Sequence, residues 1–132
     1  MSLVAALLFG IVAGLRTLTG EAVFFGFRGG TWGIVFILGA IGEYAVDLLP
    51  QCPSRTTIGP AIARCASGGF MGWIAAEAAG AAIGVAGALI GTFAGHRLRM
   101  RLIGLIGAVP AGATEDVVAI AIAFAAVTTL RQ

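Results

Sequence analysis

The sequence predicts an all-α integral membrane protein with about five transmembrane helices, and its composition and its pattern of apolar segments lead to this class. Of the 132 residues, 59% are hydrophobic and only 11% are charged, whereas ordinary soluble domains are about 45–50% apolar and about 25% charged. A globule of this size still exposes about a third of its unfolded surface, so the surrounding solvent is expected to be lipid. The apolar segments are long and lack strand-like alternation, which favours helices over a closed barrel.

The N-terminal part of the chain is expected to form one short helix, followed by a segment whose structure the sequence does not determine. The helix covers about residues 3–18, which is short for a span, since about 20 apolar residues are typical. Residues 19–30 are aromatic and interrupted by glycines. This stretch is either an interfacial turn or a re-entrant piece, and the sequence does not separate the two.

Prolines delimit the next two helices. One runs from about residue 31 to 49 and is stopped by Pro50, because proline cannot continue a helix. Residues 51–57 then form the clearest loop in the chain. The following helix starts near Pro60, a residue suited to a first helical turn, and continues to about residue 79.

The C-terminal part is expected to form two further helices, within a single domain that covers residues 1–132. One helix spans about residues 80–96 and the other about 114–130, with an amphipathic connection from Arg97 to Pro110 between them. Glycines at spacings of three and four put a smooth face on a helix, where a second helix can approach closely. The glycines expected at helix-packing faces are Gly10, Gly14, Gly80, Gly84, Gly87, Gly91 and Gly95.

One motif occurs twice in the chain. Residues 8–16 read LFGIVAGLR and residues 89–97 read LIGTFAGHR, so both contain Leu-x-Gly-x-x-Ala-Gly-x-Arg. With five spans, the helices that carry the two copies cross the membrane in opposite directions. The copies would then form an inverted repeat of the kind found in small transporters, with halves 1–79 and 80–132. Chance similarity in a chain rich in glycine and alanine is the alternative.

Charged residues cluster around the central loop. Glu43 and Asp47 lie four residues apart on one helix face, and Arg64 lies about one turn into the next helix. A lone charge at the bilayer centre costs about 2.5–3.5 kcal/mol, so these side chains are expected to face one another rather than lipid. With Arg55 from the loop, they form either a polar site for an ion, a proton or an anionic headgroup, or a structural staple of a helical hairpin.

Two further groups of charges lie at helix ends. Arg16 and Arg97 occupy equivalent places in the two motif copies, where each could extend to lipid headgroups or form part of a site. Glu115 and Asp116 are expected in the first turn of the last helix, where acidic side chains complement the positive helix end. Their alternative partners are Arg97, Arg99 and Arg101.

Several functional classes are not expected. The chain has no P-loop, no Gly-x-Ser-x-Gly, no His-Glu-x-x-His and no nucleophile–base pairing, which argues against an enzyme and gives no indication of a cofactor. One histidine without matching ligands predicts no metal site. The net charge of +2 does not indicate a nucleic-acid partner. Cys52 and Cys65 are too few for a disulfide framework.

Short polar motifs run along nearly the whole chain. In the centre they are Gly42–Glu43, Asp47, Pro50, Pro53–Ser54–Arg55–Thr56, Gly59–Pro60, Arg64 and Ser67–Gly68. Towards the ends they are Gly14–Leu15–Arg16, Ala94–Gly95–His96–Arg97–Leu98–Arg99 and Glu115–Asp116. With these motifs the chain resembles the bacterial family of small membrane proteins known as domain of unknown function 4126. The resemblance implies an integral membrane protein with these polar motifs and does not indicate a substrate.

We therefore expect a homo-oligomeric, multi-pass protein of the bacterial inner membrane that serves as a transporter or channel for a small solute or ion. Arginines would attract or neutralise an anion, and carboxylates would hold the arginines or carry protons. The alternative is a non-transporting scaffold or accessory subunit whose charges only staple the helices. Membrane lipid is the other expected partner. The residues expected at the polar site are Arg16, Glu43, Asp47, Arg55, Arg64, Arg97, Glu115 and Asp116.

Overall fold

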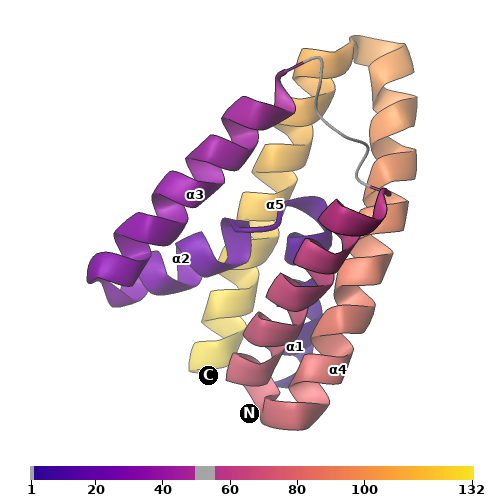
Figure 1. Ribbon diagram of the computed structural model, residues 1–132. Coiled ribbons are helices and arrows are strands. Elements are labelled where there is room, and N and C mark those ends of the chain that lie inside the picture. The colour runs from indigo at the N-terminus through magenta and orange to yellow at the C-terminus, as the bar shows by residue number, and fades with distance from the viewer. Residues whose placement is uncertain (1, 50–55) are drawn as a thin grey trace.

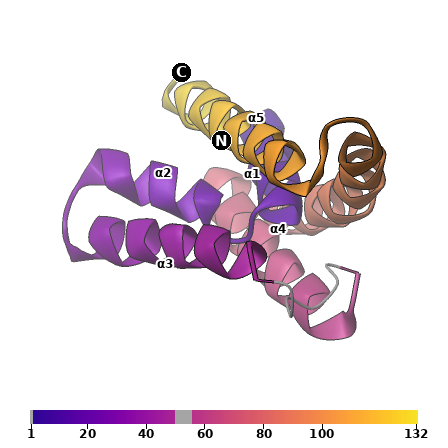
Figure 2. The same ribbon diagram turned by 90° about the horizontal axis from the view of Figure 1, so that it is seen from above.

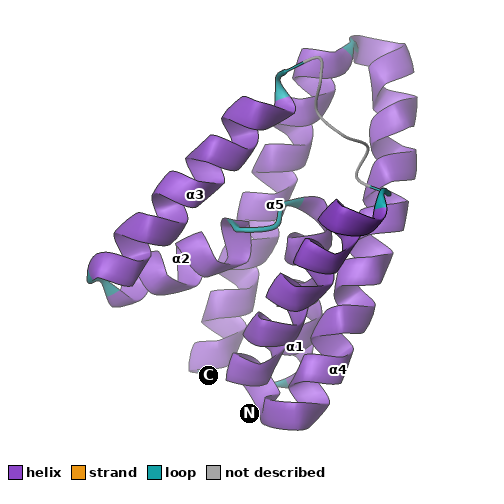
Figure 3. Cartoon of the chain, viewed as in Figure 1, coloured by secondary structure: helices purple, strands orange, loops and turns teal. Residues whose placement is uncertain are grey.

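A computed structural model describes residues 2–49 and 56–132 of the protein (Figure 1). Within these ranges the chain is helical with short connecting loops and contains no strand (Figure 3), so the predicted all-α class is confirmed. Cys52 and Arg55 lie outside the described residues. The helices are α1 (Leu3–Leu15), α2 (Thr19–Arg28), α3 (Thr31–Asp47), α4 (Ile58–Ile106) and α5 (Ala108–Arg131).

Helix α4 consists of two antiparallel arms. The backbone leaves the helical conformation at Ala76 (φ −158°, ψ 36°) and Glu77 (φ 52°, ψ −141°). We call residues 58–75 the first arm and residues 78–106 the second arm. The two arms correspond to the predicted third and fourth helices, and the turn between them lies at the same end of the bundle as both chain ends (Figure 1).

Glycines let the two arms approach to backbone contact. A Cβ added at any of four glycines would overlap a carbonyl oxygen of the facing arm. Such close approach gains van der Waals contact between the two backbones. The four are Gly68 and Gly72 on the first arm and Gly80 and Gly84 on the second arm.

Helix α1 is the central helix of the bundle. Ala5, Phe9 and Val12 on α1 are fully buried. Ala5 and Phe9 belong to a core that also contains Met71 of the first arm and Ala126 of α5. One hydrophobic core therefore contains residues from α1 and the first arm, before the turn of α4, and from α5, after that turn.

Helix α1 and the second arm run in the same direction. Gly10 faces Gly87, and Gly14 faces Gly91 further along both helices. The motif copies at 8–16 and 89–97 are therefore parallel, and the predicted inverted repeat is wrong. The physical reason is α2, a short helix that reverses the chain once more between α1 and α3 than a count of five spans assumes (Figure 1).

The connection between the second arm and α5 is shorter than predicted. The second arm continues as helix through Ile106, and Gly107 alone separates it from α5. Gly107 has a φ of +88°, a conformation that glycine adopts at little cost. Pro110 falls in the first turn of α5, where its missing N–H group is not needed. The predicted amphipathic connection over residues 97–110 is therefore wrong.

Much of the outer surface is apolar. By length and composition α4 and α5 could each cross a membrane, and α1 is a shorter apolar helix. Helix α3 packs beside α2 (Figure 2). Its side chains Trp32, Ile34 and Leu38 are 66%, 62% and 62% exposed, and extensive exposed apolar surface is typical of proteins that meet a membrane or another chain.

Candidate functional site

Arg16 lies in the turn between α1 and α2 and is only 2% exposed. Its Nη1 atom is 3.0 Å from Oδ2 of Asp47 at the end of α3, and its Nη2 atom pairs with Oδ1 of Asp116 on α5. The guanidinium also lies over the ring of Tyr44, 5.0 Å from the ring centroid. One buried cation therefore connects the end of α1 with α3 and α5.

A second arginine extends these contacts into a network. Arg99 on the second arm places its Nη1 atom 2.7 Å from Oδ2 of Asp47 and 3.1 Å from Oε2 of Glu115 on α5. Asp47 thus bridges two arginines from different helices. We call Arg16, Asp47, Arg99, Glu115 and Asp116 the ion-pair network.

Glu43 on α3 caps the start of α2. Its Oε1 atom accepts a hydrogen bond from the N–H group of Thr17 at 2.8 Å, and its Oε2 atom accepts one from the N–H group of Leu18 at 3.1 Å. The first N–H groups of a helix have no partner within the helix, and a carboxylate there complements the helix dipole. Glu43 therefore fixes the start of α2 relative to α3.

Replacing Glu43 by glutamine is expected to lower the free energy of unfolding by about 0.5–2 kcal/mol, the usual cost of a lost helix cap. Glutamine keeps one carbonyl acceptor but loses the second acceptor and the negative charge. Chemical unfolding in detergent micelles, followed by circular dichroism, measures the loss. The control is Glu77→Gln in the exposed turn of α4, and an equal loss in both variants would contradict the capping role.

A cavity of about 380 Å³ opens to the surface beside the turn between α1 and α2, and we call it the polar cavity because charged side chains contribute to its otherwise mostly apolar lining. Its polar lining consists of Arg16, Thr17, Glu43, Asp47 and Arg64. Arg64 comes from the first arm and is 6% exposed. Glu43, Asp47 and Arg64 were expected to face one another, and all three line this cavity. Arg16 lines it as well.

The other predicted site residues do not all join this cavity. The first turn of α5 holds no acidic residue, because the helix begins at Ala108. The prediction that Glu115 and Asp116 cap this helix is therefore wrong, and both pair with arginines of the ion-pair network. Arg97 is exposed and lines a separate groove on the second arm with Arg101.

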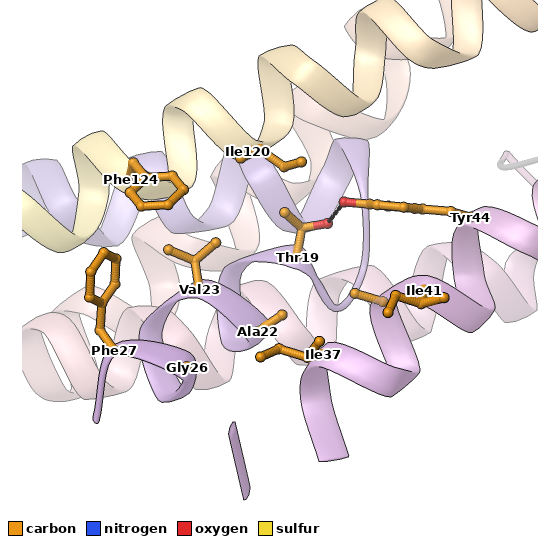
Figure 4. A pocket seen from close by; sticks show the side chains of 11 residues that line it. Thr19, Ala22, Val23, Gly26, Phe27, Ile37, Ile41, Tyr44, Ile120 and Phe124 are labelled. Atoms are coloured by element: carbon orange, nitrogen blue, oxygen red, sulfur yellow. Dashed lines mark hydrogen bonds between the residues drawn. The ribbon is translucent and has the colours of Figure 1, made fainter. Parts of the chain in front are cut away.

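A second group of polar contacts, on α2, was not predicted from the sequence. Glu21 is 2% exposed, and its Oε1 atom lies 2.5 Å from the hydroxyl oxygen of Ser67 on the first arm. The hydroxyl oxygen of Thr19 lies 2.7 Å from the hydroxyl oxygen of Tyr44. Both residues line an apolar groove of about 420 Å³ between α2, α3 and α5 (Figure 4). The available signal was a lone acidic residue in the aromatic segment 19–30.

Metal chemistry has no evident site in the described part of the chain, where no three His, Cys, Asp or Glu side chains are grouped to hold an ion. Cys65 on the first arm is a free cysteine. Comparison of the chain with protein-family models, curated proteins and solved structures finds no match.

Proposed function

We propose that this chain is a multi-pass protein of the bacterial inner membrane that moves a small solute or ion across the bilayer as a homo-oligomer. The observation that carries the proposal is the group of charged side chains that line the polar cavity of a bundle with a largely apolar surface. Ionisable groups at membrane depth usually mark the path of an ion or a substrate. The cavity contributes four of them: Arg16, Glu43, Asp47 and Arg64. The bacterial inner membrane is part of this proposal and is what the resemblance to domain of unknown function 4126 implies, whereas no family model matches the chain.

The helix lengths suit a bilayer. Helix α5 has 24 residues, and at about 1.5 Å per residue it would extend about 36 Å, enough for a hydrocarbon core of about 30 Å. Helix α1 has only 13 residues and would end within the bilayer, with α2 returning towards the starting face. The turn at residues 16–18 lines the cavity, and irregular backbone is tolerated at membrane depth where it lines such a cavity.

A second copy of the chain would complete the conduit. Among the described helices, the backbone of α3 comes close only to that of α2, and Asp47 at its end reaches the second arm through Arg99. Helix α3 leaves most of its apolar side chains exposed. A chain of this size encloses little space by itself. We therefore infer that the outward face of α3 packs on a neighbouring copy or on lipid.

The ion-pair network favours a second candidate function, that of a non-transporting scaffold or accessory subunit. Arg16 and Arg99 join α1, the second arm, α3 and α5 through carboxylates. A structural staple would make the same contacts. In a scaffold these charges would fix the helix arrangement and bind no solute.

Flux into proteoliposomes tests the transport proposal. The purified protein is assayed with protons, inorganic anions and metal cations against empty liposomes. Arg64→Gln removes a cavity charge and is expected to lower flux by at least about tenfold, since a hydrogen bond to a charged group contributes about 1.5–3 kcal/mol. Arg101→Gln, on the exposed part of the second arm, is the matched control and should keep wild-type flux.

Folded yield separates the two functions and is measured by size-exclusion chromatography. For a transporter, the Arg64→Gln protein is folded and conducts little. If the wild-type protein conducts none of these solutes and Arg64→Gln mainly lowers the folded yield, the scaffold function is supported instead.

A further inference from the structure

Glu21 is a buried acidic side chain, and no ion pair joins it to a cation in the described part of the chain. It is 2% exposed, and in the described part of the chain its Oε2 atom has no hydrogen-bond partner. Its Oε1 atom lies 2.5 Å from the Ser67 hydroxyl oxygen. The same hydroxyl oxygen lies 2.6 Å from the carbonyl oxygen of Thr17. Ser67 therefore stands between two oxygen atoms, both at hydrogen-bonding distance.

One serine hydroxyl has a single proton and cannot donate to both of these oxygens. If Glu21 were ionised, its carboxylate and the Thr17 carbonyl would compete for that proton, and one of them would be left unpaired. If Glu21 is a neutral acid, its O–H group donates to Ser67, and Ser67 donates to Thr17. Only the neutral acid satisfies both contacts.

The surrounding charges also disfavour an ionised Glu21. An unpaired buried carboxylate is so costly that such a group usually becomes neutral. The arginine in the turn after α1 is engaged by two carboxylates and forms no ion pair with Glu21 in the described part of the chain. The charged and titratable groups on the elements around α2 include Arg16, Glu43, Tyr44, Asp47, Arg64, Arg99, Glu115, Asp116 and Arg131, and of these Arg131 lies over the ring of Phe27 at the far end of α2.

We propose that Glu21 is a proton-binding site, neutral at physiological pH, whose proton is connected through Ser67 to the backbone of Thr17. This inference goes beyond the proposed transport function and does not require it. Thr17 also donates its N–H group to Glu43 and lines the polar cavity. Loss of the proton would turn the Ser67 hydroxyl towards Glu21 and leave the Thr17 carbonyl unpaired, which would loosen one wall of that cavity.

Infrared spectroscopy of the full chain in lipid nanodiscs tests the proposal. At neutral pH we expect the carbonyl band of a protonated carboxylic acid, which shifts when the glutamates carry ¹³C carboxyl groups. The band is expected to be lost in Glu21→Gln. It should remain in the control Glu43→Gln, because Glu43 accepts two N–H groups as a carboxylate.

Ser67→Ala keeps the test decisive if Glu21→Gln does not fold. Alanine removes the hydrogen-bond acceptor, so the same band should persist and move to higher frequency. Absence of a label-sensitive band at neutral pH would overturn the proposal. So would a band that survives in Glu21→Gln, or one that Ser67→Ala does not move. No solute gradient is involved, so a failure of the transport proposal leaves this result unaffected.

Discussion

Arg16→Gln is expected to lower the free energy of unfolding by about 3–5 kcal/mol, the usual cost of removing one partner of a buried ion pair. Arg16 is 2% exposed and contacts both Asp47 and Asp116. Glutamine would take away the cation that Asp116 contacts, whereas Asp47 keeps its contact with Arg99. Denaturant titration in mixed micelles, with the helical signal followed by circular dichroism, measures the change.

The second copy of the repeated motif supplies a matched control. Arg97 occupies the position equivalent to Arg16 but is exposed on the second arm, so Arg97→Gln is expected to change stability little. Adding Asp116→Asn to Arg16→Gln should recover part of the loss, because the carboxylate that lost its partner becomes neutral. Equal losses for the two arginines, or no recovery in the double variant, would contradict the buried pairing.

The contrast between Arg16 and Arg97 shows what a local motif leaves undetermined. Both arginines end the same nine-residue pattern. The first lies beside the central helix of the bundle, while the second faces outward, and Arg99 is the residue of its arm that joins the ion-pair network. Burial depends on which helices surround a residue, and the motif itself carries no such information.

Helix positions follow from the sequence more directly than helix directions do. Apolar runs and prolines locate α3, both arms of α4 and most of α5. The direction of α1 relative to the second arm depends on whether the short aromatic segment after α1 reverses the chain. The sequence-based prediction starts α5 too late, because Pro110 is compatible both with a helix break and with a first helical turn. The positive φ of Gly107 ends the second arm before Pro110, so the proline falls in the first turn of α5.

The candidate site divides in the same way. Glu43, Asp47 and Arg64 follow from spacing, since consecutive helices bring the residues near their connection together. Glu21 and Ser67 are separated by 46 positions and meet only because α2 packs on the first arm. No spacing rule connects those two residues, so only the folded arrangement reveals their contact.

Gly84→Ala is expected to destabilise the protein, although alanine is the better helix former by about 1 kcal/mol. A Cβ at Gly84 would overlap the carbonyl oxygen of Gly68 and lie 3.2 Å from the Cα atom of Gly72. The two arms must then separate. The packing of Gly10 on Gly84 would be disturbed as well, so α1 would lose contact together with the hairpin. Overpacking of a tight core typically costs about 1–3 kcal/mol.

Gly104→Ala is the matched control, since a Cβ at this position of the same arm would meet nothing within 4 Å. Helix propensity acts alone there, and alanine is expected to stabilise the protein by up to about 1 kcal/mol. The two chemically identical substitutions should therefore shift the midpoint of thermal unfolding in micelles in opposite directions. A shift of the same sign would mean that the arms do not meet through their backbones. The parallel placement of α1, which depends on the same row of glycines, would then lose its basis.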